Sequence, residues 1–82
     1  MSAEDTPEPD VTEDARGLLC PIPVIKLAER VADIPVGGSV LLLADDPAAE
    51  EDVRFWCRGQ GHELLNVERS GPVARIRVRR VR

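Results

Sequence analysis

The strongest constraint on the fold lies near the end of the chain, where apolar residues and arginines alternate without a break. Within a predicted strand over residues 73–81, apolar residues alternate with arginines from position 74 to position 79: Ala74, Ile76 and Val78 against Arg75, Arg77 and Arg79. Successive side chains of a β-strand point to opposite faces of the sheet. The segment therefore predicts a strand that packs one face on a core and presents a row of guanidinium groups on the other.

The other strands are predicted from shorter patterns. Residues 40–44 form a continuous apolar run, which is typical of a central strand with neighbours on both sides. A third strand is predicted over about residues 62–68, joined to the last one by Ser70-Gly71-Pro72. A short first strand over residues 10–15 has a weak pattern of its own.

Two helices are predicted between these strands. The first begins near Pro21 to Pro23 and ends before Pro35; its apolar residues follow the helical repeat, namely Val24, Leu27, Ala28 and Val31. The second is expected to begin with Asp46 as its N-cap and Pro47 as its first residue, and to run to about Arg58. Its expected inner stripe consists of Ala49, Val53, Trp56 and Cys57.

The predicted order is therefore β-α-β-α-β-β. It favours a two-layer α/β sandwich of the α+β type, in which two helices cover one face of a four-stranded mixed sheet. We expect the domain to span residues 10–82. Residues 1–9 are acidic and proline-rich, and we expect them to form a disordered tail.

Composition excludes several classes of function. Only 2% of the residues are aromatic and the chain has 82 residues, which leaves no room for a flavin or dinucleotide cofactor. From these residues we expect neither a signal peptide nor a membrane-spanning run, and two cysteines are too few for a disulfide framework. We expect a cytoplasmic protein with free thiols, a monomer that binds neither a cofactor nor a metal.

Cys20 is the candidate reactive residue. It stands between a predicted strand and a predicted helix, directly before Pro21 and Pro23. The N–H groups and dipole of a helix N-terminus favour an anion and lower the pKa of a cysteine there, which predicts an activated thiolate. The other cysteine, Cys57, is expected to be a packed core residue. His62 is the only histidine, and neither a base for a cysteine hydrolase nor four zinc ligands can be assembled.

The residues around Cys20 also form a motif. The segment 14–23, Asp-Ala-Arg-Gly-Leu-Leu-Cys-Pro-Ile-Pro, resembles the signature of the TusA-like (SirA-like) sulfur-carrier family, a Cys-Pro-x-Pro after an Asp-x-x-Gly turn. Three later segments resemble the second half of the same family: Asp45-Asp46-Pro47, Asp52 and Gly61-His62-Glu63-Leu64. The resemblance covers about residues 10–82.

This resemblance implies a sulfurtransferase that carries a persulfide sulfur on Cys20. It implies a donor protein, such as a cysteine desulfurase or a rhodanese-like protein, and an acceptor protein in a sulfur-relay pathway; tRNA thiolation is one such pathway. The motif residues Asp14, Arg16, Gly17, Pro21 and Pro23 are expected to shape the turn or position the thiol. Ile22 departs from the family, in which this position is often acidic, so the usual contact with a partner is not assumed.

Two alternatives stay open from the sequence. The first is a regulatory or binding module, in which the arginine-bearing sheet face contacts a protein or RNA and Cys20 is incidental. Direct binding of nucleic acid is disfavoured, because the sheet has no exposed aromatic residues on which bases could stack. The second is a redox switch between Cys20 and Cys57.

Overall fold

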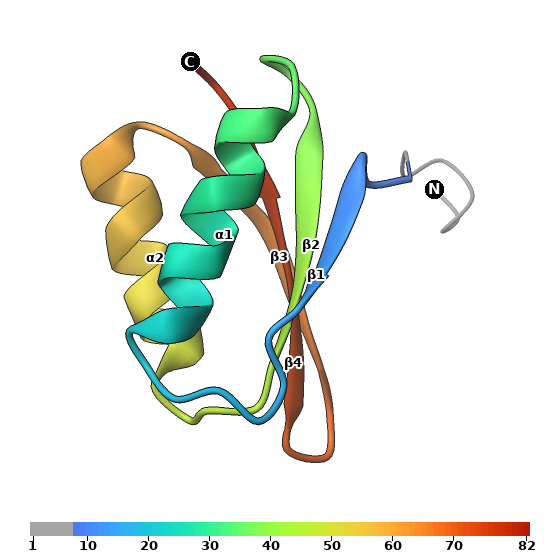
Figure 1. The fold of residues 1–82 in the computed structure, drawn as a ribbon, viewed down its shortest axis with the longest axis vertical. Helices are drawn as coiled ribbons and strands as arrows, with labels where there is room; N and C mark the ends of the chain where they lie inside the picture. The colour runs from blue at the N-terminus through green and yellow to red at the C-terminus, as the bar shows by residue number, and fades with distance from the viewer. Residues whose placement is uncertain (1–7) are drawn as a thin grey trace.

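A computed structural model describes residues 8–82 of the chain. The elements follow the expected order: β1 (Val11–Asp14), α1 (Ile22–Asp33), β2 (Ser39–Ala44), α2 (Ala49–Gln60), β3 (Glu63–Ser70) and β4 (Val73–Arg79). Figure 1 shows the two helices lying side by side against one face of the sheet. The predicted two-layer sandwich is therefore confirmed. The acidic tail that the sequence predicts falls mostly on residues 1–7, which lie outside the described part of the chain.

The sheet has the strand order β1-β2-β4-β3. β1 pairs with β2 in parallel, while β4 lies antiparallel to both β2 and β3. Because β1 and β2 are parallel, the loops that leave their carboxyl ends meet at the same edge of the sheet. Those two loops carry Cys20 and the pair Asp45-Asp46, so the topology brings these residues together.

The core lies between the sheet and the helices and is wholly aliphatic apart from Cys57. The side chains of β4 alternate as predicted: Ala74, Ile76 and Val78 are buried, whereas Arg75 and Arg79 are exposed. The fully buried core side chains with the largest volumes are Leu27, Leu42, Ile76, Val40, Val53, Val78 and Pro23. Burying a side chain such as Leu or Val contributes about 1.5–3 kcal/mol, so this layer supplies most of the driving force for folding.

No helix of the described residues covers the opposite face of the sheet (Figure 1). Here the guanidinium groups of β4 stand next to side chains of the neighbouring strands: Arg79 forms an ion pair with Glu63 of β3. Leu41 of β2, the register partner of Arg77, is only 8% exposed. The face therefore mixes basic, acidic and apolar groups. Among residues 8–82, no helix is both long enough and apolar enough to cross a bilayer.

Candidate functional site

Cys20 lies on the loop between β1 and α1, at the surface and partly exposed. The loop is held by its own backbone: the Leu18 amide donates to the Ala15 carbonyl at 3.2 Å, and the Ile22 amide donates to the Leu19 carbonyl at 2.9 Å. Helix α1 begins at Ile22, directly after the Cys20–Pro21 peptide bond, which is cis. The start of the helix agrees with the sequence prediction.

Two aspartates on the neighbouring loop fix the cysteine loop in place. The Asp46 carboxylate accepts a hydrogen bond from the Cys20 amide at 2.8 Å, and the Asp45 carboxylate accepts one from the Gly17 amide at 2.9 Å. Asp46 also accepts a hydrogen bond from the Ala48 amide at 2.8 Å. One carboxylate thus joins two loops that are 26 residues apart in the sequence.

The predicted role of Asp46 as the N-cap of the second helix is therefore wrong. Helix α2 begins at Ala49, with Ala48 in the cap position and no side-chain cap. Pro47 lies in the turn that precedes the helix. The reason is that Asp46 uses one carboxylate oxygen to close this turn and the other to hold the Cys20 amide.

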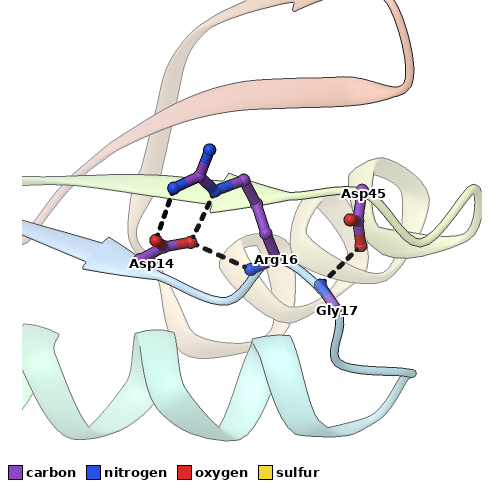
Figure 2. A network of polar contacts seen from close by, with 4 residues as sticks. All are labelled: Asp14, Arg16, Gly17 and Asp45. Atoms are coloured by element: carbon purple, nitrogen blue, oxygen red, sulfur yellow. Dashed lines mark hydrogen bonds and ion pairs between the residues drawn. The ribbon is translucent and has the colours of Figure 1, made fainter.

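Asp14, Arg16 and Gly17 shape the start of the cysteine loop, as Figure 2 shows. The Arg16 guanidinium donates to both carboxylate oxygens of Asp14, at 2.9 and 2.7 Å, and the Arg16 amide donates to the same carboxylate at 3.1 Å. These hydrogen bonds lower the pKa of Asp14 to about 2, although both side chains are about half exposed. Gly17 follows with φ of 81°, a conformation that favours glycine.

The pKa of the Cys20 thiol is higher than the sequence predicts. Partial burial raises its pKa to about 12, together with a hydrogen bond to the Asp52 carboxylate and the negative charges of Asp52 and Asp46. The predicted lowering by the helix N-terminus is therefore wrong. Burial removes the water that would solvate the thiolate, and the nearby negative charges disfavour it further.

The surface around Cys20 is unusually apolar for an exposed region. Leu19 is 74% exposed on the loop, and Phe55 is 77% exposed on α2. Between α1 and α2, a groove of about 320 Å³ begins beside the thiol; Pro21 and Asp52, both neighbours of Cys20, line it together with Phe55. Neither the exposed Phe55 nor the contact of Asp52 with the thiol was found from the sequence. The only signal for Asp52 was its place in the family motif.

The remaining site predictions concern buried residues. Cys57 is only 3% exposed on the inner face of α2, and burial raises its pKa to about 11, so it is a core residue as predicted. Both cysteines are free. Pro23, in the first turn of α1, is fully buried, whereas Pro21 is exposed. No cluster of three or more side chains suited to a metal ion lies within residues 8–82.

The chain is a small domain of the order β-α-β-α-β-β, in which two helices cover a mixed sheet. Its accessible cysteine lies on the loop that enters the first helix, and these two features together define a class of thiol-bearing domains. Residues 12–80 match the family model described as Sulfurtransferase TusA. The fold is similar to the crystal structure of a SirA-like protein from Desulfitobacterium hafniense, with a TM-score of 0.77 and 27% sequence identity over 88% of this chain and 99% of that one. The chain belongs to the TusA sulfurtransferase family, and its general role is that of a sulfur carrier that works with partner proteins.

Proposed function

We propose that Cys20 is the sulfur-carrying residue and that it holds the transferred sulfur as a persulfide. The observation that supports this most is the contrast between the two cysteines. Cys20 is partly exposed on a loop that Asp46 fixes in place, whereas Cys57 is enclosed in the core. A sulfur that passes between two proteins has to be reached by both of them, which only Cys20 allows.

The proposed loading step is a displacement at sulfur. Cys20, as the thiolate, attacks the terminal sulfur of a persulfide on the donor protein; a cysteine desulfurase or a rhodanese-like protein is a suitable donor. The bond between the two donor sulfurs breaks, the donor cysteine leaves as a thiolate, and Cys20 holds the new S–S bond. The proton of Cys20 passes to the departing donor thiolate or to solvent. Delivery to an acceptor repeats the same displacement in the other direction.

The carboxylates beside Cys20 regulate the reactivity of the thiol in this step. In the isolated domain, burial together with Asp52 and Asp46 raises the pKa of Cys20 to about 12, so the resting thiol is neutral. A donor or acceptor that brings cationic side chains close to the two carboxylates lowers this pKa and favours the thiolate within the complex. The exposed Leu19 and Phe55 provide apolar contact area next to the same thiol. We place this relay in the cytoplasm, where thiols stay reduced.

The alternative of a binding module that works through the arginine-bearing face has weaker support. Arg79 is paired with Glu63, and Glu68 is the register partner of Arg75. Acidic side chains thus stand among the basic ones, and this weakens the attraction of the face for a polyanion.

The experiment is to incubate the protein with a cysteine desulfurase and cysteine and to measure its intact mass. We expect the gain of one sulfur atom, reversed by a thiol reductant. Cys57→Ala is the matched control and gains the same mass, while Cys20→Ser gains none. A Cys20→Ser protein that still takes up sulfur, or a folded Cys57→Ala protein that does not, contradicts the assignment.

A further inference from the structure

A second groove of about 320 Å³ lies between the helices, towards their C-terminal ends. One wall is formed by Ala28 and Ala32 of α1, and the other by Trp56 and Gln60 of α2. The chain's last residues cross this end of the molecule, and Figure 1 shows the C-terminus at the opposite end from the loop between β1 and α1. The groove shares Trp56 and Gln60 with the groove beside the thiol, but its other lining residues lie at the opposite end of the helices from Cys20.

Arg80 and Arg82 line this groove, and each is anchored by only part of its guanidinium group. Arg80 donates through Nη1 to the Ile34 carbonyl at 2.5 Å and through Nε to the Arg82 carbonyl at 3.1 Å. A longer contact of 3.4 Å joins Nη1 to the Ala32 carbonyl. Arg82 donates through Nε to the Gln60 carbonyl at 3.3 Å. Within residues 8–82, these bonds leave Nη2 of Arg80 and both terminal nitrogens of Arg82 available to another acceptor.

His62 is the third residue that offers a nitrogen donor to the groove. Its Nδ1 accepts a hydrogen bond from the Val81 amide at 3.1 Å, so the neutral ring carries its proton on Nε2. The ring lies 5.4 Å from that of Trp56, measured between centroids and with a tilt of 37°, and the two rings line the same groove. Burial lowers the pKa of His62, and the positive charges of Arg80 and Arg82 near the ring lower it further.

Among residues 8–82, no Asp or Glu side chain lines the groove, in contrast to the surface around Cys20. Partly anchored guanidinium groups are well suited to an oxyanion, because their position is fixed before binding while N–H donors remain unused. The alanines and the aromatic rings supply an apolar wall, and the volume is within the range of small-molecule pockets. Charge, donors and shape thus point to one kind of ligand.

We propose that this groove binds a small organic oxyanion, in which a phosphate or carboxylate group is attached to an apolar or planar body. The anionic group contacts the free nitrogens of Arg80 and Arg82 and the Nε2 proton of His62. The body lies along Trp56 and the alanines of α1. This site goes beyond sulfur transfer and does not depend on the role proposed for Cys20.

Trp56 is the only tryptophan of the chain and makes a direct test possible. Its fluorescence is titrated with AMP and with benzoate, which present a phosphate and a carboxylate on a planar body, and with adenosine and inorganic phosphate as the separate parts. We expect a saturable change with AMP or benzoate, half complete below about 1 mM, and weaker binding of both parts. Inorganic phosphate and acetate, which carry the two anionic groups without a planar body, are compared in the same titration, and the one that binds more tightly identifies the preferred anion.

The variant Arg82→Gln keeps a polar side chain but loses the charge, and Arg75→Gln removes the same charge from the open face of the sheet. Arg82→Gln is expected to weaken binding on the order of tenfold, since a hydrogen bond to a charged group is lost, whereas Arg75→Gln keeps the affinity of the unaltered protein. The proposal is overturned if neither AMP nor benzoate gives a saturable signal, or if the two variants weaken binding equally. A normal melting curve for Arg82→Gln shows that the loss is not one of folding.

Discussion

Replacing Asp52 by asparagine tests the electrostatic control of the thiol, because it removes a charge and keeps the shape of the side chain. Asp52 accepts a hydrogen bond from the Cys20 thiol and places a negative charge beside it. A neighbouring charge shifts a pKa by about 1–3. Since Asp52 is exposed to solvent, we expect Asp52→Asn to lower the pKa of Cys20 by about 1–2 from its value of about 12.

The expected change in reactivity follows from this shift. When the pKa of the thiol falls by 1, roughly ten times more thiolate is present at neutral pH. The thiolate also becomes less nucleophilic as its pKa falls, with a Brønsted coefficient of about 0.4–0.5. The net gain is roughly three- to fourfold for each such decrease in pKa. We therefore expect the alkylation of Cys20 by iodoacetamide to be about 3- to 15-fold faster in the variant.

The assay follows the alkylation of the protein by its intact mass as a function of time, at several pH values. Every protein also carries Cys57→Ala, so that only Cys20 can react. Glu51→Gln is the matched control, since Glu51 lies beside Asp52 in the first turn of α2 and the same charge is removed from the same helix end. Glu51→Gln is expected to keep the original rate. If both variants react at the same rate, the carboxylate of Asp52 does not control the thiol, and our reasoning fails.

Three further predictions concern how the site is held. Asp46→Ala removes the acceptor of the Cys20 amide, so the hydrogen exchange of this amide is expected to be on the order of tenfold faster by NMR, whereas Asp45→Ala leaves it unchanged. Pro23→Ala leaves a gap in the core, and we expect it to lower the free energy of unfolding, measured by urea denaturation, by about 1–2 kcal/mol. A loss of no more than a few tenths of a kcal/mol would contradict a role for Pro23 in the packing of the core. Cys57→Ala is expected to cost a similar amount, about 1–2 kcal/mol, and a variant as stable as the parent would contradict its assignment to the core.

The fold could be predicted from the sequence because local periodicity decides most of it. The alternation in residues 74–79 and the apolar run of residues 40–44 each define which side chains are buried, and the structure agrees at these positions, although the strand predicted over residues 73–81 ends at Arg79. The start of α1 at Ile22 was predicted equally well, since two prolines after a strand leave few other choices. These features depend on neighbours within a few residues.

The electrostatics of the site could not be predicted in the same way. Asp46 reads as a helix cap because a proline follows it, yet its carboxylate holds the Cys20 amide from a distance of 26 residues in the sequence. Burial of the thiol, together with the approach of Asp52 from another part of the sequence, raises the pKa of Cys20, which is opposite to the expected direction. Pro23 likewise reads as part of a rigid turn, and only the packing of α1 on the sheet shows that it is buried.

The place of β4 in the sheet has a consequence for the order in which the protein folds during synthesis. β4 is the last strand to be translated, but it lies between β2 and β3, and β3 has no other partner in the sheet. A nascent chain that ends before Val73 therefore has neither a paired β3 nor a covered edge on β2. The two loops that form the thiol site depend on β2, so we expect them to settle only once the last strand has left the ribosome, in one cooperative event with the whole sheet.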